Sequence, residues 1–309
     1  MSDKIKIAFF GTPDFGLPSF KSLVRDQRLK ICFVVTQPDK KVGRRQILTP
    51  PPIKLEALKH NIPIFQPEKI KNFSLPYKID LIVTAAYGQI IPKNILDAPK
   101  YGSINIHGSL LPKYRGASCI QAAILNGDNK TGITIIKMTE KLDAGPIIAQ
   151  KEIKIKKGET AGELYKRLSL LAAKMIIPVI FSYIQGTIKL EPQNESKASY
   201  VGLLTKKDGE IDWNKSATEL ERFVRAMTPW PGAYCFIKKD KIRVKVIKVN
   251  SKILKINKYK IGEIFSCKKK LAVQCGQNAL IIEKLQISGK KEISGEEFLR
   301  GYQDYIYLF

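Results

Sequence analysis

Asn105, His107 and Asp143 are the residues of this sequence whose types and spacing could carry out a reaction. Asn105 and His107 fall in the stretch Gly-Ser-Ile-Asn-Ile-His-Gly, residues 102–108, where isoleucines alternate with polar residues as they do in a strand. Residues two apart on a strand face the same side, so we expect Asn105 and His107 to point together. An amide can stabilise an oxyanion, an imidazole can transfer a proton, and a carboxylate can orient the imidazole. The group could therefore transfer an acyl group to an amine without a metal or a covalent nucleophile.

Each of these residues also has a structural interpretation when it is taken alone. A histidine that ends a buried strand can be a hydrogen-bonded core residue, Asn105 can form a turn, and Asp143 can be a loop acid. The catalytic interpretation is favoured because the polar pair ends a strand, and open α/β sheets place their chemistry at the carboxyl ends of strands.

The elements that position this group alternate between strand-like and helix-like patterns in the first half of the chain. Strands are expected at residues 4–11, 30–37, 80–88, 102–108 and 131–138, and helices at 18–25 and 53–61. This alternation predicts an α/β fold with a doubly wound, mostly parallel, Rossmann-like sheet. The turn at residues 11–16, Gly-Thr-Pro-Asp-Phe-Gly, departs from G-x-G-x-x-G, which disfavours a nicotinamide oxidoreductase.

A second domain is expected after a polar stretch. We predict a catalytic domain at residues 1–188, a linker at 189–205 and a basic domain at 206–309. In the basic domain a helix at 216–228 precedes about five short strands, and a helix follows at 294–302. Short strands separated by Asn, Gly and Lys predict a small OB-like β-barrel.

Charge indicates a polyanionic partner. The formal net charge is +25, of which +12 lies in residues 231–290. Residues 238–260 alternate Lys and Arg with Val and Ile, so strands there would carry cations on one face. A generic lysine-rich composition is the alternative, and the row of cations favours nucleic acid.

Cysteine usage and hydropathy indicate a cytoplasmic protein. The five cysteines include no Cys-x-x-Cys pair, and the two histidines lie far apart in the sequence, so we expect no metal site. Unpaired cysteines suit a reducing compartment. The sequence opens on a strand pattern instead of a signal peptide. The apolar stretch at 168–184 is interrupted by Lys174 and Pro178, so we interpret it as a buried helix and expect no membrane association.

Asn-x-His-Gly-Ser-Leu-Leu-Pro, followed by Leu142-Asp143-Ala144-Gly145, resembles the signature of the folate-dependent formyltransferases. The likeness extends through nearly the whole chain, including the stretches at 7–20, 211–234 and 294–302. It implies transfer of a formyl group from 10-formyltetrahydrofolate to an amine. The insertion after the second strand and the basic second domain resemble those members that act on initiator Met-tRNA in bacterial translation initiation.

The resemblance also implies roles for individual residues. Asn105 would stabilise the oxyanion, His107 would accept the proton of the amine or donate to the oxyanion and the leaving nitrogen, and Asp143 would fix the imidazole. The folate would lie along two segments, Ser109, Leu110, Leu111 and Pro112 in one and Tyr87, Gly88, Gln89, Ile90 and Ile91 in the other. A methionine pocket would be shaped by Gly11, Thr12, Pro13 and Phe15, although this turn also fits a purely structural role.

The basic insertion at 38–52 should be an exposed loop that contacts the acceptor end of the tRNA. Its cations are Lys40, Lys41, Arg44 and Arg45. Arg44 matches the family pattern, whereas Arg45-Gln46-Ile47 departs from it. A second departure is Cys119, which replaces a proline and which we interpret as structural.

Two other functions remain open at this point. One is a formyltransferase that acts on a small amine, such as a ribonucleotide or an amino sugar. The other is an RNA-binding module on a decayed α/β domain, which the intact Asn105, His107 and Asp143 disfavour. We expect the protein to be a monomer.

Overall fold

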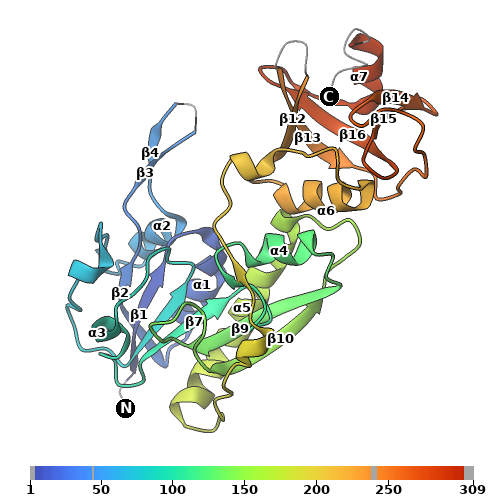
Figure 1. Cartoon of the computed structure of the whole chain (residues 1–309). Coiled ribbons are helices and arrows are strands. Elements are labelled where there is room, and N and C mark those ends of the chain that lie inside the picture. The colour runs from blue at the N-terminus through green and yellow to red at the C-terminus, as the bar shows by residue number, and fades with distance from the viewer. Residues whose placement is uncertain (1–3, 44, 238–241, 303–309) are drawn as a thin grey trace. The chain divides into compact units, whose positions relative to one another are not determined.

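The computed structural model describes residues 4–43, 45–237 and 242–302, and its contacts divide the chain into two units. The first unit holds residues 1–119, 131–153 and 165–202, and the second holds 120–130, 154–164 and 203–309. Figure 1 labels the elements of both units. Two short internal segments therefore group with the carboxyl-terminal part of the chain. The domain boundaries at 188 and 206 remain a prediction.

A seven-stranded sheet organises the first unit, in the order β10-β9-β7-β6-β1-β2-β5. The strands are β1 Ile5–Gly11, β2 Leu29–Val35, β5 Ile64–Phe65, β6 Leu81–Ala85, β7 Ser103–His107, β9 Lys130–Lys137 and β10 Ile147–Lys154. The ladders that join β5, β2, β1, β6 and β7 are parallel, whereas β9 pairs antiparallel with β7. The mostly parallel sheet is confirmed, and the strand predicted at 131–138 forms its antiparallel part.

The order of the parallel strands reverses at β1. Strands β2 and β5 lie on one side of β1, and β6 and β7 lie on the other. Such a reversal leaves a crevice beyond the carboxyl ends of the strands, where ligands bind in open α/β sheets. Gly11, Ala85 and His107 end β1, β6 and β7, so they lie along this edge.

The central strands are buried almost throughout. All of β6 and the last five residues of β1 are buried, which is the pattern of a parallel sheet covered on both faces. One core cluster on this sheet contains Ala8, Phe10, Phe33, Val35, Ile70, Ile79, Ile82, Tyr87, Ile91, Ile95 and Leu96. The short segments after β5 and β6 are thus fixed to the sheet by their own apolar side chains.

The helices of the first 184 residues are α1 Leu17–Arg25, α2 Pro52–Lys59, α3 Lys93–Leu96, α4 Cys119–Leu125 and α5 Ala161–Ile184, with 3-10 turns η1 Asp14–Gly16 and η2 Ile70–Asn72. All but the first residue of α4 belongs to the second unit. Helix α5 covers the predicted stretch and continues through Pro178. By length and composition it could cross a membrane. Leu168, Ala172, Ile176 and Ile180 form a fully buried stripe along it, as in a core helix.

The basic insertion is a hairpin that projects from the first unit (Figure 1). Strand β3, Lys40–Val42, pairs antiparallel with β4, Ile47–Thr49, and every residue of both is exposed. The exposed location is as predicted, but the segment is paired backbone instead of an irregular loop. Arg44 lies outside the described residues.

The polar stretch that follows α5 contacts the first unit closely. Strand β11, Tyr200–Val201, pairs in parallel with β8, Arg115–Gly116, and the 3-10 turn η3, Glu195–Lys197, precedes it. An isolated bridge joins Glu191 to Ile147. We call residues 191–201 the strap. Residues 191–201 of the predicted linker, 189–205, are therefore bound to other strands of the first unit.

An antiparallel sheet forms the core of the second unit, as expected for a β-rich domain. Its strands are β12 Ala233–Ile237, β13 Ile242–Val249, β14 Ile264–Cys267, β15 Lys270–Gln274, β16 Ala279–Ile287 and β17 Glu292–Ser294. They follow the order β12-β13-β16-β15-β14, and β17 also pairs with β16. The other elements are η4 Lys207–Gly209, α6 Ala217–Met227 and α7 Gly295–Gly301. Capping boxes at Ser216 and Ser294 begin the two α-helices.

Strand β13 carries the predicted row of cations. Val244 and Val246 are buried, whereas Arg243 is exposed and Lys245 is half-buried. Lys248 is also exposed, but it follows a register shift after Val246 and lies outside this alternation. Arg243 stacks over the ring of Tyr234 at 3.7 Å. The alternation in sequence thus places valines in the core and cations outside.

Candidate active site

Strand β7 aligns Asn105 and His107 at the carboxyl edge of the sheet, as predicted. Asn105 pairs in register with Thr84 of β6, and His107 pairs with Thr134 of β9. The strand lies between two others, so its backbone is fixed on both sides. Asn105 is half-buried and His107 is 5% exposed. The amide therefore borders solvent, while the imidazole lies behind it in the protein.

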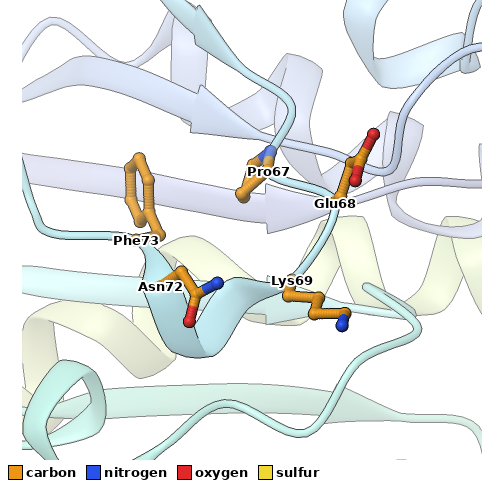
Figure 2. A pocket seen from close by; sticks show the side chains of 5 residues that line it. All are labelled: Pro67, Glu68, Lys69, Asn72 and Phe73. Carbon is orange, nitrogen blue, oxygen red and sulfur yellow. The ribbon is translucent and has the colours of Figure 1, made fainter.

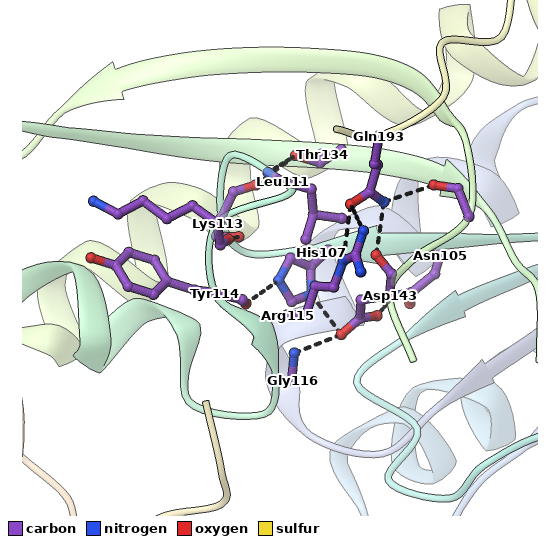
Figure 3. Close-up of polar contacts among 12 residues, drawn as sticks. Asn105, His107, Leu111, Lys113, Tyr114, Arg115, Gly116, Thr134, Asp143 and Gln193 are labelled. Atoms are coloured by element: carbon purple, nitrogen blue, oxygen red, sulfur yellow. Dashed lines mark hydrogen bonds and ion pairs between the residues drawn. The ribbon is translucent and has the colours of Figure 1, made fainter. Parts of the chain in front are cut away.

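Asp143 lies between these two side chains (Figure 3). Its Oδ1 accepts a hydrogen bond from Nδ2 of Asn105 at 3.2 Å. Its Oδ2 accepts one from the backbone N–H of Gly116 at 2.8 Å and lies 3.5 Å from Nδ1 of His107. The structure thus brings together all three predicted residues, and both carboxylate oxygens are engaged. Because an amide carries two N–H groups, Asn105 keeps a second one for another acceptor.

The environment of His107 favours the charged imidazolium. Nε2 lies 2.9 Å from the carbonyl oxygen of Tyr114, and Nδ1 faces Asp143. Burial alone would lower the pKa of His107, but the contacts with Cys119, Asp143 and the Tyr114 carbonyl outweigh it and raise this pKa to about 9. An imidazole with an acceptor at each nitrogen is satisfied when both nitrogens carry protons.

Both residues that face the imidazole nitrogens have left-handed backbones. Asp143 has φ of 49° and Tyr114 has φ of 63°. Residues other than glycine seldom adopt this region, and bulky residues least of all. Strained backbones of this kind persist only where the surroundings hold them. The contacts to His107 therefore depend on what fixes these two positions.

Cys119 has an effect on His107 that the sequence did not indicate. We interpreted its thiol as structural because the sequence offers it no partner, but the thiol also acts on His107, since its proximity raises the pKa of the imidazole. The residue is 6% exposed and is the first residue of α4. No local pattern indicated the contact, because the turn between His107 and Cys119 brings the two together.

Two further residues were not predicted, Arg115 and Gln193. Arg115 is fully buried, pairs with Glu195 at 2.7 Å and donates to the hydroxyl of Tyr200 at 2.9 Å. The hydrogen bonds with Glu195 and, to a lesser extent, Tyr200 raise the pKa of Arg115 above the ordinary value of an arginine, so the guanidinium stays charged. Gln193 bonds both to Arg115 and to the Asp143 loop. Nothing in the sequence distinguishes a buried arginine from the exposed cations around it.

The two segments expected to hold folate follow neighbouring parallel strands. Gly88 has φ of 92°, and Ile90 beside it is 78% exposed. Gln89 instead fixes the preceding loop, because its Oε1 accepts from the N–H of Ile70 at 2.8 Å. Tyr87 and Ile91 lie in the core cluster. Gln89, Tyr87 and Ile91 therefore hold the segment in place, and the side chain of Ile90 is left exposed.

The second segment, residues 109–112, is held largely by its backbone. The hydroxyl of Ser109 donates to the carbonyl of Lys113 at 2.6 Å. Leu111 is buried, its N–H donates to Thr134 at 3.1 Å, and its carbonyl accepts from Gln150 at 2.7 Å. These bonds fix the turn after β7, with Leu110 and Pro112 half-buried beside Leu111.

The turn expected at the methionine pocket, residues 11–15, joins the ends of three strands of the sheet. The hydroxyl of Thr12 donates to the carbonyl of Tyr87 at 2.8 Å and accepts from the N–H of Gln37 at 3.3 Å. It thereby ties the ends of β1, β2 and β6. Phe15 is buried against the ring of Tyr165, at 5.2 Å between centroids. Gly11 is buried and Pro13 is half-buried. These contacts support the structural alternative for this turn.

The cations of the hairpin β3–β4 extend away from the sheet. Lys40, Lys41 and Arg45 are all exposed. Val42, Ile47 and Leu48 are also exposed, at 55%, 60% and 61%. An exposed element that mixes cations with large apolar residues is typical of a binding surface.

A shallow pocket of about 380 Å³ lies in the loop after β5 (Figure 2). Its lining residues are Pro67, Glu68, Lys69, Asn72 and Phe73. It shares no lining residue with the predicted site, and Nε2 of Gln89 joins the two by donating to the carbonyl of Glu68 at 3.1 Å. Within residues 4–43, 45–237 and 242–302, no cluster of His, Cys, Asp and Glu is arranged to hold a metal.

Comparison with known families places this site in context. The family model described as "Formyl transferase" matches residues 5–180, and the one described as "Formyl transferase, C-terminal domain" matches residues 203–303. The chain is 42% identical to the methionyl-tRNA formyltransferase of Bacillus subtilis over 303 residues, 96% of this chain and 94% of that protein. It is 39% identical to the protein of the same name in Staphylococcus epidermidis over 306 residues, 97% of each.

Solved structures show the same fold at lower identity. An N-formyltransferase from Helicobacter canadensis, in complex with folinic acid and dTDP-3-aminofucose, aligns with a TM-score of 0.66 at 20% identity, over 90% of this chain and 98% of that one. A 4-N formyltransferase from Francisella tularensis aligns with a TM-score of 0.63 at 23% identity, over 79% and 97%. At these identities the likeness concerns the fold.

Proposed function

The chain belongs to the formyl transferase family, and we propose that it transfers the formyl group of 10-formyltetrahydrofolate to the α-amino group of initiator methionyl-tRNA. The observation that carries the proposal is the contact of Asp143 with both Asn105 and His107 at the carboxyl edge of the sheet. Relatives named methionyl-tRNA formyltransferase match the chain over nearly its full length, and this supports the choice of acceptor. The setting of such a reaction is the bacterial cytoplasm, where we place the protein as a monomer.

The folate segments fit a flat, partly apolar ligand. Ile90 offers exposed apolar surface, and a Cβ added at the left-handed Gly88 would meet Cγ of Gln37 at 4.0 Å. When bound, the folate supplies an activated formyl group attached to nitrogen. We propose that the frame made by Gln89, Tyr87 and Ile91 and the turn at 109–112 hold it beside Asn105.

Asn105 and His107 would stabilise the charge that develops on the formyl oxygen. One N–H of Asn105 is directed to Asp143, and the second would donate to that oxygen. Removal of such a donor typically costs about 3–4 kcal/mol of transition-state stabilisation. The raised pKa of His107 favours donation over acceptance, so we assign it to the oxyanion or the leaving nitrogen. Both of its N–H groups face acceptors in this structure, so this donation would replace the contact of Nε2 with the carbonyl of Tyr114.

Asp143 would hold this arrangement and balance the imidazolium charge. No strong base is required, because a free α-amino group has a pKa of about 8 and is partly neutral near pH 7. The proton lost by the attacking amine would therefore pass to solvent, the folate nitrogen that releases the formyl group would take a proton from His107, and His107 would be reprotonated from solvent.

The tRNA would be bound by cations outside the catalytic group. Lys40, Lys41 and Arg45 on the hairpin, with Arg44 beside them, are proposed to contact the acceptor end, and the cations of β13 to contact phosphates. Methionine would enter near the turn at 11–15, whose observed contacts are structural.

One assay tests the proposal directly. The full chain is incubated with 10-formyltetrahydrofolate and initiator Met-tRNA, elongator Met-tRNA, uncharged tRNA, free methionine or an amino-sugar nucleotide. Formylation confined to Met-tRNA supports the proposal. Turnover of the amino sugar with none on Met-tRNA would establish the small-amine alternative, and no turnover on any acceptor would refute formyl transfer.

A further inference from the structure

Gln193 of the strap uses every polar position of its side-chain amide. Its Oε1 accepts from Nε and Nη2 of Arg115 at 3.1 and 2.9 Å. Its Nε2 donates to the carbonyl of Asp143 at 2.8 Å and to that of Gly145 at 2.7 Å (Figure 3). An amide has two N–H donors and two oxygen lone pairs, so all four are used. Its orientation is therefore fixed from both ends.

The strap also holds the other residue that faces the imidazole. The hydroxyl of Ser199 accepts from the N–H of Tyr114 at 2.9 Å, and the carbonyl of Ser199 accepts from the N–H of Arg115 at 2.8 Å. At its start, Glu191 exchanges two backbone hydrogen bonds with Ile147, at 2.8 and 3.0 Å. One segment thus fixes both loops that contact His107.

Arg115 gives this arrangement a rigid centre. Its side chain is fully buried, and Nη1 and Nη2 donate to the two carboxylate oxygens of Glu195 at 2.9 and 2.7 Å. The remaining donors reach Gln193 and Tyr200. A planar guanidinium with fixed partners allows little movement of the groups it binds. The strap is therefore anchored at the point from which Gln193 reaches Asp143.

We propose that the strap positions His107 and Asp143 for catalysis, and that Gln193 is the residue through which it acts on Asp143. The strained backbones of Tyr114 and Asp143 are stabilised by Ser199 and Gln193 respectively. Gln193 is a positioning residue, because the structure gives it contacts to loops and to Arg115. The kinetic part of this proposal rests on the proposed formyl transfer.

Two substitutions of Gln193 separate its contacts. Gln193→Met keeps the length and removes all four hydrogen bonds. Gln193→Glu keeps an acceptor for Arg115 but cannot donate to the carbonyls of Asp143 and Gly145. We expect kcat for Met-tRNA formylation to fall roughly 10²-fold in both, as a misplaced catalytic group does, with KM values changed by less than about twofold.

A matched control comes from the second unit. Gln274 is buried and also joins separate backbone segments, since its Nε2 donates to the carbonyls of Ile256 and Asn278 at 3.2 and 2.9 Å. Gln274→Met should lower the thermal unfolding midpoint while kcat stays within about twofold of the wild type. Ser199→Ala gives a milder change at the other end of the strap, should Gln193→Met fail to fold.

A second readout does not depend on turnover. The chain has two histidines, His60 and His107, so the imidazole signals can be followed by NMR during a pH titration, and His60→Gln assigns them. Asp143 and Cys119 are the titratable groups in contact with His107. If the strap fixes Asp143, the titration midpoint of His107 moves to lower pH in Gln193→Met and stays in place in Gln274→Met. Gln193→Glu is tested by kcat alone, because its added carboxylate would itself favour the imidazolium.

The two readouts distinguish the proposals. A wild-type protein that fails to formylate Met-tRNA would refute the proposed function, and the titration would still decide the role of the strap. An unchanged His107 midpoint in folded Gln193→Met, or a kcat within about twofold of the wild type in the Gln193 variants, would overturn the positioning role.

Discussion

Oδ2 of Asp143 lies 3.5 Å from Nδ1 of His107, and the same oxygen accepts the N–H of Gly116 at 2.8 Å. Gly116 can take part because it has no side chain. A Cβ there would lie 2.2 Å from the carbonyl oxygen of Val201, and its φ is 109°. His107 is thus held at the end of β7, and Asp143 is held through Gly116, which packs against Val201 of the strap.

The amide of Asn105 should contribute mainly to the transition state. Asn105→Ala is expected to lower kcat by about 10²-fold or more, with a small change in KM, because an oxyanion donor acts only when charge develops. Steady-state formylation of Met-tRNA measures both. Asn126→Ala is the control, since Asn126 bonds only to the carbonyl of Ala122 in the described contacts, at 3.0 Å. Near-normal kcat in Asn105→Ala would remove this residue from the mechanism.

The pH dependence of kcat/KM should be bell-shaped. The rate rises as the attacking α-amino group loses its proton near a pKa of about 8. It falls again as His107, with its pKa raised to about 9, loses the proton that it donates. Asp143→Asn should move the falling limb to lower pH, because a neighbouring carboxylate favours the imidazolium. A rate that keeps rising through the pKa of His107 would contradict its role as donor.

The free energy of unfolding should decrease as the pH rises from 6.5 to about 9. The pKa of His107 is about 9 in the folded protein and 6.5 in a model peptide. Its contribution is therefore fully present below pH 6.5 and is lost as pH rises through 9, by an amount of about 3 kcal/mol. Urea unfolding of the wild type and His107→Gln, at about pH 6 and about pH 9.5, measures this. An equal pH dependence in the two proteins would show that His107 does not cause it.

The thiol of Cys119 should influence the pH profile. Because its contact with His107 raises the pKa of the imidazole, Cys119→Ala is expected to shift the falling limb to lower pH. Cys275→Ala is the matched control, since Cys275 is buried in the second unit and its thiol contacts the carbonyl of Val273. If both variants keep the wild-type profile, Cys119 has no electrostatic effect on catalysis.

The hairpin should account for part of the salt dependence of tRNA binding. Each phosphate contact contributes about −0.9 to the slope of log K against log salt for duplex nucleic acid. Lys40→Gln with Lys41→Gln should therefore reduce the slope by about 2. Lys59→Gln is the control, because Lys59 on α2 pairs with Glu56 at 3.1 Å. A slope that is equal in the double variant and the control would locate tRNA binding outside the hairpin.

Local patterns in the sequence predicted the frame of the first unit and the residues at its edge. Apolar runs predicted β1, β2, β6 and β7, because buried strands of a parallel sheet are apolar on both faces. The alternation around Asn105 and His107 predicted their common face, because side chains on a strand repeat every two residues. In the same way, the alternation of cations and valines predicted the two faces of β13.

Only the tertiary structure decided how the site is held. Arg115 and Gln193 look like ordinary polar residues in sequence, and their burial and bonding arise because the strap returns to β8 after helix α5. The contact of Cys119 with His107 depends in the same way on the path of a turn. Periodicity reports which face of an element a residue occupies. It carries no information about which distant segment covers that face, because such contacts are chosen by the packing of the whole domain.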